Sequence, residues 1–465
     1  MVAFASAAAQ FPALLGERGL LPVPRYVART AHLARRHRTP SLFRLRYDDR
    51  LLRVVAWTGV VLGASVVVGL PQAGPWWVPT LVLLACWGGY LSIVAVGQTF
   101  YGFGWETLLC ELTFLVAWCG SDDVPVPVPV VVVLARWLLL RLELGAGLIK
   151  LRSGDPSWRD LTAMQYHQET QPMPGPLSWH AHHLPGWWHR TEVAGSHVAQ
   201  LGAPLLLLAP QPVASVGALV MLVTQVALIT TGNYAWLNAA AVVLALAVVD
   251  DVTWARLLPW VSPTGPDGDG SGPSGAVHDV PVAFVVAVVA VTVVLVARSW
   301  PPLRNLFSSQ QLMNASFGRW RFVNAYGAFG SMTKRRFEVV VEGQGDAGTW
   351  HEYVFRGKPG PVGRRPRQVA PYHLRLDWLM WFLALRGYDD TWFDTFLGRL
   401  LAADRPTLRL LAHDPFDGAP PVAVRARLFR YRYTTRAEHR ATGDWWTREP
   451  VTDLVPPLTR RPAAR

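Results

Sequence analysis

The chain has 465 residues, of which 51% are hydrophobic and only 16% are charged, and it contains 22 tryptophans. This composition is not that of an ordinary soluble domain and predicts an integral membrane protein. Its 44 basic and 32 acidic residues give a net charge of +12, and residues 299–465 hold 26 basic against 15 acidic side chains. The arginines there alternate with aromatic residues in strand-like runs, which favours the solvated faces of a folded domain and argues against nucleic acid as a partner.

Apolar runs of helical length recur over the first 300 residues. Residues 1–16 are too short to cross a bilayer, which takes ~20 residues, and are interpreted as the end of a first span. A basic segment with ten arginines follows over Glu17–Arg53, and we interpret it as an amphipathic loop that contacts lipid phosphates. The chain is thus predicted to begin with a polytopic α-helical membrane domain over 1–300, with membrane lipids as partners. Eight full spans are expected, at about 51–70, 77–98, 103–120, 127–149, 193–209, 213–231, 234–249 and 280–298.

Two of these predicted spans carry ionisable side chains. Glu106 and Glu111 lie in one of them, and Arg136 and Arg141 lie in the next. A charge in the middle of a bilayer costs a few kcal/mol, so these groups should face the interior of the bundle and pair. We expect Arg136 or Arg141 to form a structural pair with Glu106 or Glu111, and we favour this over a proton relay.

A long loop, Leu151–Glu192, is rich in tryptophan, histidine and proline. Three tryptophans are expected at the level of the lipid headgroups, where an indole ring satisfies both its apolar body and its N–H group: Trp179, Trp187 and Trp188. Four histidines raise the hypothesis of a zinc or iron site: His180, His182, His183 and His189. No HExxH helix or cysteine pair accompanies them, so we predict neutral interfacial histidines and no metal.

The pattern changes after the last predicted span. The segment Ser262–Gly275 has the composition of a flexible linker between spans. Pro301 and Pro302 are expected to stop the last helix, which puts the domain boundary near Trp300–Arg304. Residues 301–465 then form an extramembrane domain, and because it contains no cysteine, no disulfide can stabilise it.

The extramembrane domain is predicted to be α+β, with an antiparallel, β-sandwich-like sheet. In Arg336–Glu342, Phe337, Val339 and Val341 alternate with the residues of the other face, as in a half-buried strand. A glycine turn leads to a returning strand at Trp350, which makes a hairpin. Helical spacing follows over 373–386 and 391–402, and a further strand over 421–433.

The sequence contains no G-x-S-x-G elbow, Walker loop, Rossmann glycine set, HExxH or CxxC motif. The prediction is therefore a protein that is not an enzyme and that needs no cofactor.

Several ordered blocks carry a family resemblance: Asn324-AYGAFGSMTKRRFEVVVEG, Trp350-HEYVFRGKPG, Pro371-YHLRLDWLMWF, Arg427-LFRYRYT and Asp444-WWTRE. In this order and spacing they resemble the C-terminal domain of the lipase maturation factor family. Upstream, Gly145-AGLIKLRSGDPSWRDLTAMQYHQETQPMPGPLSW is similar to a loop of the same family. The resemblance covers nearly the whole chain.

The resemblance implies a polytopic membrane protein, found in animals in the endoplasmic reticulum, that helps homodimeric secreted lipases to fold and assemble. It implies a chaperone-like role without catalytic residues, in which the C-terminal domain binds the client, and we expect exposed aromatic side chains on its sheet to offer that contact. The content of alanine, valine and arginine suggests a bacterial source and hence the plasma membrane. The motif residues expected in the client domain are Asn324, Tyr326, Gly327, Phe329, Gly330, Glu338, Trp350, Pro371, Tyr372, Arg375, Asp377, Trp378, Trp381, Arg430, Trp445 and Trp446; Tyr326, Gly327 and Gly330 should shape a turn.

A weaker resemblance supplies the alternative function. The membrane half is similar to the transmembrane domain of vitamin K-dependent γ-carboxylases, in which a lysine after such a glycine-rich span acts as a base. Lys150 takes that place here, and desolvation favours the neutral amine that a base requires. Under this alternative Lys150 would act with His167 or His180; the interpretation we favour is a lysine that extends to the membrane surface from a helix end.

The topology prediction rests on two opposing arguments. Eight spans place the basic segment Glu17–Arg53 and the C-terminal domain on one side, and the positive-inside rule makes that side cytoplasmic. The family resemblance implies the opposite side. Long domains cross membranes largely regardless of charge, so we expect an extracytoplasmic C-terminal domain.

Overall fold

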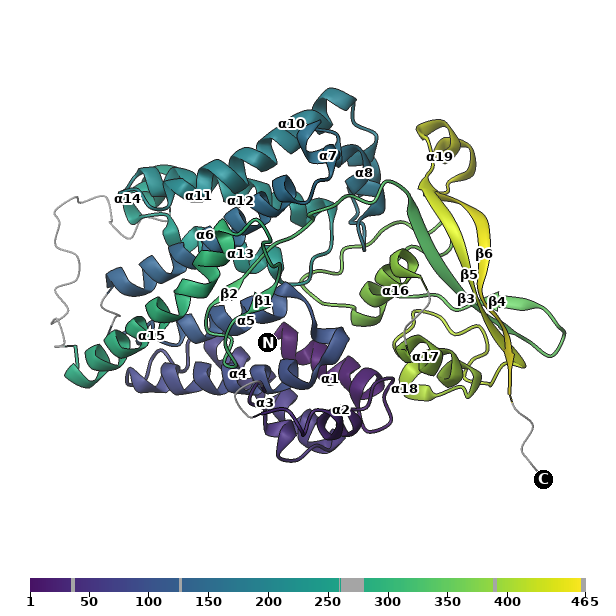
Figure 1. Ribbon diagram of the computed structural model, residues 1–465, viewed down its shortest axis with the longest axis horizontal. Helices are drawn as coiled ribbons and strands as arrows, with labels where there is room; N and C mark the ends of the chain where they lie inside the picture. The colour runs from purple at the N-terminus through teal and green to yellow at the C-terminus, as the bar shows by residue number, and fades with distance from the viewer. Residues whose placement is uncertain (35–37, 125–127, 259, 261–279, 388–390, 461–465) are drawn as a thin grey trace.

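The computed structural model describes residues 1–34, 38–124, 128–258, 260, 280–387 and 391–460. The helices of the first 307 residues lie at one end of the molecule and a four-stranded sheet at the other, with α16 and α17 between them (Figure 1). The segment Ser262–Gly275, expected to be a linker, lies outside the described residues. The overall class is therefore as predicted, a mostly helical N-terminal region followed by an α+β region.

The N-terminal region is built from helices of very different lengths. In chain order they are α1 (Val2–Leu15), α2 (Val23–Arg29), η2 (Leu42–Arg44), α3 (Asp49–Val67), α4 (Trp77–Val96), η3 (Gln98–Tyr101), α5 (Gly104–Val116), α6 (Val128–Arg152), α7 (Pro156–Arg159), α8 (Ala163–Thr170), α9 (Ser178–His182), α10 (Gly186–His197), η4 (Val198–Gly202), α11 (Ala203–Leu206), α12 (Val213–Thr231), α13 (Leu237–Val248), α14 (Asp251–Leu257) and α15 (Val282–Phe307). Local signals set several of their ends: the Asp48 side chain, for example, caps α3 by accepting from the backbone N of Leu51 at 2.7 Å.

Four described helices are long and apolar enough to cross a membrane, namely α3, α4, α12 and α15, and the pair α13 and α14, bent by 103°, would add a fifth. The other expected spans fall on different elements. Helix α5 has only 13 residues, α6 carries several charges in its 25 residues, and 193–209 is divided between α10, η4 and α11. The structure thus supports an integral membrane protein, while the number of crossings stays a prediction.

Helix α15 does not stop at Pro301 and Pro302 as expected, but continues to Phe307. Two prolines remove two backbone donors, so the last turn needs support from outside the helix. Arg152 supplies it by donating to the carbonyl of Leu306 at 2.7 Å, and Asn305 exchanges hydrogen bonds with the backbone of Leu312. The helix therefore extends past the predicted boundary, and the division into domains at residue 300 stays a prediction.

A short antiparallel pair, β1 (Ala315–Ser316) and β2 (Asn324–Ala325), follows α15 and lies among the helices rather than with the main sheet (Figure 1). Its loop carries Trp320 and Phe322, whose rings stack on Trp87 of α4 at centroid distances of 5.9 and 5.5 Å. Phe322 also packs on Phe114 of α5 at 4.3 Å. The first residues of the C-terminal region are thus embedded in the helical region.

The main sheet contains β3 (Arg336–Gln344), β4 (Trp350–Glu352), β5 (Ala423–Tyr433) and β6 (Trp446–Thr459) in the order β4-β3-β5-β6, all antiparallel. The predicted hairpin of β3 and β4 and the predicted strand β5 are confirmed. Strand β6 contains three prolines, Pro450, Pro456 and Pro457, which an edge strand tolerates because one row of its N–H groups needs no partner. The helices of this region are α16 (Arg375–Arg386), α17 (Thr391–Leu401), α18 (Arg405–Leu408) and α19 (Arg436–Thr442).

Strand β3 is buried on both faces, which corrects the expectation of a half-buried strand. Val339 and Val341 face α16 and α17 in the main hydrophobic core. On the opposite face Glu338 is fully buried, and Val340 packs in a second cluster with Trp179 from the helical region. The second layer over the sheet consists of helices and loops, so the sandwich-like arrangement is not found in the described residues.

The segment around Gly327 and Gly330, where the sequence predicts a turn, is irregular backbone that follows β2. Neither glycine has a positive φ; Phe329, between them, has φ 54°. A Cβ atom at Gly327 would lie 2.8 Å from the exposed side chain of Met313, which would have to move to make room for a larger residue. The carbonyl of Gly330 accepts a hydrogen bond from the indole of Trp158 at 3.0 Å.

Candidate functional site

Many of the predicted motif residues meet at the contact between the helices (1–307) and the C-terminal region (308–460), which we call the junction. Three clusters of buried charged side chains form it, and each joins residues far apart in the sequence. Because a buried charge is tolerated only when it is paired and hydrogen-bonded, each cluster fixes how the two regions sit against each other.

The first cluster pairs Arg375, at the start of α16, with Glu106 of α5. The guanidinium Nη1 lies 2.5 Å from a carboxylate oxygen of Glu106 and 2.8 Å from the carbonyl of Phe100. The guanidinium also lies 3.4 Å from the centroid of the Tyr101 ring. The other oxygen of Glu106 accepts from the Tyr90 hydroxyl, and both charged residues are fully buried.

Helix α1 contributes two polar side chains to the same cluster. The amide of Gln10 donates to the carbonyl of His373 at 2.7 Å and accepts from the backbone N of Arg375 at 3.0 Å. Ser6 donates to the same carbonyl at 3.2 Å. Burial, followed by the charge of Arg375, lowers the pKa of His373 to about 4, so the ring is neutral and its Nδ1 can accept from the indole of Trp105 at 3.4 Å.

The second cluster surrounds Glu111 of α5. Asn324 donates to one carboxylate oxygen from its backbone N at 3.0 Å and from its side chain at 2.9 Å, and Tyr326 donates to the same oxygen at 2.7 Å. Arg141 pairs with the other oxygen and donates to the carbonyl of Asn324 at 2.6 Å. The predicted pair of Arg141 with Glu111 is confirmed, and both acidic residues of α5 are bound by the C-terminal region.

The third cluster is centred on Glu338 of β3. Its two oxygens pair with Arg336 at 2.5 Å and with Lys358 at 2.8 Å, and all three side chains are buried. Arg336 also crosses to the helical region, where it donates to three carbonyl groups in and after α8: those of Glu169, Gln171 and Pro172.

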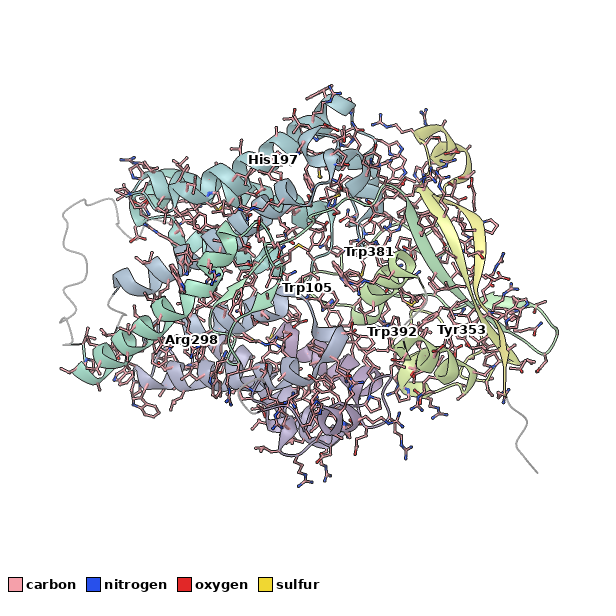
Figure 2. All side chains as sticks on the ribbon, in the orientation of Figure 1. Trp105, His197, Arg298, Tyr353, Trp381 and Trp392 are labelled. Carbon is pink, nitrogen blue, oxygen red and sulfur yellow. The ribbon has the colours of Figure 1, made fainter. Side chains whose placement is uncertain are left out.

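Three further motif residues lie on α16, one of which, Trp381, is labelled in Figure 2. The carboxylate of Asp377 accepts from the backbone N of Gly357 at 2.6 Å and of Lys358 at 3.0 Å, and burial raises the pKa of Asp377. Trp381 donates from its indole to the carbonyl of Thr170 at 3.0 Å, which adds a contact to α8. Trp378 is 4% exposed and belongs to the main core.

The aromatic motif residues pack inward, contrary to the expectation of an exposed aromatic surface. Phe329 packs edge-on against His167 and Tyr234, with centroids 5.0 and 5.3 Å apart. Trp446 is 1% exposed and stacks on Tyr433 at 4.1 Å. The sequence could not show this, because the partners come from elements that are distant in the chain.

The remaining motif residues lie outside the three clusters. Trp350 is half-buried beneath the guanidinium of Arg425 at 4.0 Å, and Trp445 and Tyr372 are half-buried. Pro371 and Arg430 are exposed. The sheet also carries ion pairs between its strands: Arg427 of β5 pairs with Asp453 of the neighbouring strand β6, and Arg448 of β6 pairs with Glu352 of β4.

Sequence reasoning missed several residues that complete the junction. Trp179 is 6% exposed and donates to the carbonyl of Thr434 at 3.0 Å, so its predicted place among the lipid headgroups is wrong, whereas Trp187 and Trp188 are 64% and 41% exposed. Ser6 and Gln10 were also missed, although polar residues four positions apart on one face of an apolar helix are a signal for buried partners.

Lys150 is buried, which corrects the interpretation of a lysine that extends to the membrane surface. Its amine donates to Ser196 at 3.1 Å and to Gln200 at 2.6 Å. The two histidines of the alternative have other contacts: His167 bonds the hydroxyl of Tyr234 at 2.9 Å, and His180 packs on tryptophan rings next to the sheet. Among the residues that the structure describes, no three His, Cys, Asp or Glu side chains are placed to hold a metal ion.

Comparison with known proteins gives one consistent result. Residues 1–256 match the family described as lipase maturation factor transmembrane domain, and residues 322–456 match the lipase maturation factor C-terminal domain. Human lipase maturation factor 1 is 36% identical, with 98% of this chain and 85% of the relative covered, and the bovine protein of the same name is 37% identical over 99% and 87%. Lipase maturation factor 2 of Xenopus tropicalis is 28% identical over 98% of this chain and 80% of the relative. No solved structure matches. The chain belongs to the lipase maturation factor family.

Proposed function

We propose that this protein is a membrane-anchored, chaperone-like factor that helps secreted proteins such as lipases to reach their active form. The names of its relatives support the maturation of lipases, and its apolar helices support a membrane anchor. The chemistry of the motif residues supports a role in architecture and binding, because their charged groups are bound by partners within the chain. Glu338, Arg375 and Asp377, for example, use their side chains to connect elements.

The proposed arrangement is a C-terminal domain held at a fixed height and angle above the membrane. The junction combines three buried charge clusters with a common hydrophobic core that includes α1, α4, α16, α17 and the sheet. A domain fixed in this way would present the outer part of its sheet to a client while the client is kept near the membrane. We propose that this side is extracytoplasmic, in the plasma membrane if the source is bacterial, and a reporter fused after Arg465 tests the side directly.

The central experiment co-expresses a secreted homodimeric lipase with this protein in cells that lack their own maturation factor. The quantity to measure is lipase activity per amount of secreted lipase, which we expect to rise with the wild type. Arg375→Met should reduce this rise because it loosens the junction, and Arg386→Met, at the exposed end of the same helix, should not. Unchanged specific activity with a well-expressed wild type, together with no secreted hydrolase recovered on co-purification, would contradict the proposal.

A non-catalytic role makes a second prediction, which concerns Lys150. Lys150→Met removes the amine but keeps most of the aliphatic chain, so we expect lipase maturation to be retained when the variant is normalised to its amount in the membrane. Complete loss of maturation with a normal amount of folded protein would favour the carboxylase-like alternative.

A further inference from the structure

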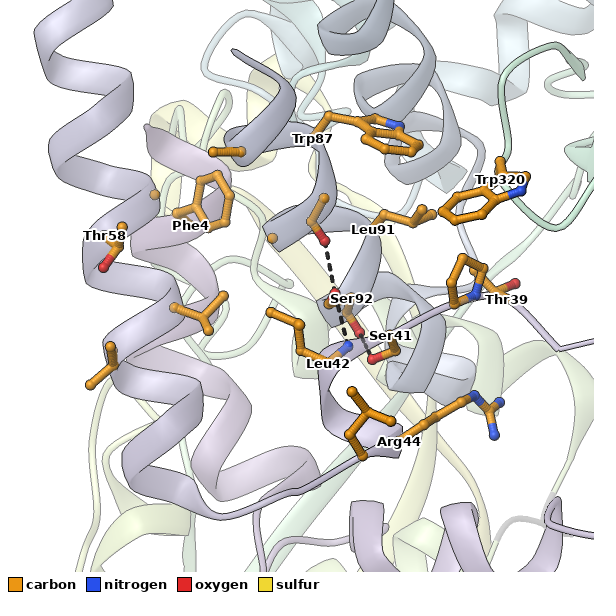
Figure 3. A pocket seen from close by; sticks show the side chains of 18 of the residues that line it. Phe4, Thr39, Ser41, Leu42, Arg44, Thr58, Trp87, Leu91, Ser92 and Trp320 are labelled. Carbon is orange, nitrogen blue, oxygen red and sulfur yellow. Dashed lines mark hydrogen bonds between the residues drawn. The ribbon is translucent and has the colours of Figure 1, made fainter. Parts of the chain in front are cut away.

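A cavity of about 940 Å³ lies between α3 and α4, and none of the residues of the three charge clusters lines it (Figure 3). Thr58 of α3 lies on one side, and Trp87 of α4 and Trp320 lie on the other. The segment 38–45 forms one end of the cavity. It is hydrogen-bonded to α4, because the Ser41 hydroxyl donates to the carbonyl of Ser92 at 2.8 Å.

The walls of this cavity are mostly hydrocarbon and continue onto the outer surface of the helices. Among the lining residues, Val54 is 57% exposed and Leu45 is 87% exposed. Helices α3 and α4 are both long and apolar enough to cross a membrane. If these two helices cross the bilayer, the exposed apolar side of this cavity faces lipid acyl chains.

The cavity is also cationic at its rim. Arg38, Arg44 and Arg319 line it, and no acidic residue does. The Nε atoms of Arg38 and Arg44 are buried and have no hydrogen-bond partner, while Nη1 of Arg44 donates to the Thr30 hydroxyl at 3.0 Å. Within the described part of the chain none of the three arginines is paired with a carboxylate. A buried donor without a partner is costly, and an anionic oxygen is the acceptor that a guanidinium binds best.

A second cavity, of about 410 Å³, is lined by residues 317–323 of the β1–β2 loop and by residues of α15 between 297 and 301. Arg319 and Trp320 line both cavities, and Arg298 and Arg321 add two further guanidinium groups to the second one. The β1–β2 loop therefore places positively charged side chains between the two cavities. This arrangement suits a molecule with one anionic group and more than one apolar chain.

We propose that the cavity between α3 and α4 binds one anionic phospholipid from the surrounding bilayer. Its acyl chains lie along the apolar walls, and its phosphate is bound by Arg38, Arg44 and Arg319. Such a lipid would attach the β1–β2 loop to α3 and α4 through its headgroup. The proposal does not depend on the identity of the client or on the maturation activity.

The test uses native mass spectrometry of the purified full-length protein in detergent. Dioleoyl-phosphatidylglycerol and dioleoyl-phosphatidylcholine are titrated separately, and we expect retention of one phosphatidylglycerol with clear preference over phosphatidylcholine. With Arg38, Arg44 and Arg319 all changed to Gln, we expect phosphatidylglycerol to bind about 100-fold more weakly, which corresponds to ~1 kcal/mol for each basic side chain. The matched control changes three exposed arginines of the same basic segment to Gln, and should bind as the wild type does: Arg18, Arg25 and Arg50.

A steric test uses Gly88, which lines the cavity and has no atom within 4 Å of the position of a Cβ. Gly88→Phe should fill the space and abolish retention of the lipid. Gly195→Phe is the control, because Gly195 is equally open but lies on α10.

Three results would overturn the proposal: equal retention of the two lipids, equal binding by the two triple-arginine variants, or displacement of phosphatidylglycerol by oleate at equal concentration. The last would assign the cavity to free fatty acids. If Gly88→Phe does not give a monodisperse protein, the two triple-arginine variants decide between the outcomes.

Discussion

Removing the positive charge of Arg375 should weaken the attachment of the C-terminal region strongly. Arg375→Met keeps the apolar part of the side chain but leaves the carboxylate of Glu106 buried with only the Tyr90 hydroxyl and the neutral ring of His373 nearby. Breaking a buried ion pair from one side costs about 3–5 kcal/mol. A unit of roughly 150 residues has an unfolding entropy of ~0.3 kcal/mol/K, so the Tm of the C-terminal region should fall by about 10–15 °C.

The assay is thermal unfolding of the detergent-solubilised protein, followed by tryptophan fluorescence and by resistance to limited proteolysis. Arg386→Met is the matched control, and because this arginine is exposed it should change the free energy of unfolding by less than ~0.5 kcal/mol. The double variant Glu106→Gln with Arg375→Met removes both charges and should recover most of the lost stability. If the two single losses simply add in the double variant, the two side chains are not energetically coupled and the reasoning about the junction is refuted.

Two further predictions concern pH and the contrast between buried and exposed pairs. The pKa of His373 in the folded protein is about 4, below the value of ~6.5 expected for an unfolded chain, so its contribution to stability is complete above pH 6.5 and is lost as the pH falls toward 4. Between pH 7.5 and pH 5 we expect a loss of ~2 kcal/mol that His373→Gln largely removes, and an unchanged pH dependence of the Tm in this variant would contradict the assignment. Glu338→Gln should lower the free energy of unfolding by several kcal/mol, because it leaves Arg336 buried next to a neutral group. Asp453→Asn, in the exposed pair with Arg427, should lower it by less than ~1 kcal/mol. Similar Tm values for the two variants would show that burial does not determine the loss of stability.

The elements of the C-terminal region could be predicted because their signals are local. The two-residue period of β3 and β5 and the helical spacing in α16 and α17 are visible within each segment. The end of α15 could not be predicted, because two prolines are a local signal against the helix while the support from Arg152 comes from another helix. The sequence predicts one span over 193–209, where the structure has α10, the π-helical turn η4 and α11. Hydropathy alone does not show such a turn, because the residues on both sides of it are mostly apolar.

The chemistry of the junction was only partly predictable. Charges in apolar helices predict that Arg136 or Arg141 pairs with Glu106 or Glu111, because an unpaired charge there is costly, and the structure shows the pair of Arg141 with Glu111. The partner of Glu106 is 269 positions away, and nothing in the sequence near Arg375 marks it as buried. The exposed aromatic surface was expected for a similar reason. The alternating pattern of a strand is the same whether its outer face is in contact with solvent or is packed against another element.

The contacts of helix α1 have a consequence for how the protein is made. Ser6 and Gln10 are synthesised long before their partner, the carbonyl of His373, which lies 367 and 363 positions later in the chain. Until that residue is synthesised, the amide of Gln10 can donate only to the Ser6 hydroxyl within α1, and the Ser6 hydroxyl lacks its native acceptor. Contact of His373 with α1 supplies the missing acceptor, so the native hydrogen bonds of this helix are completed only when the C-terminal region has been made.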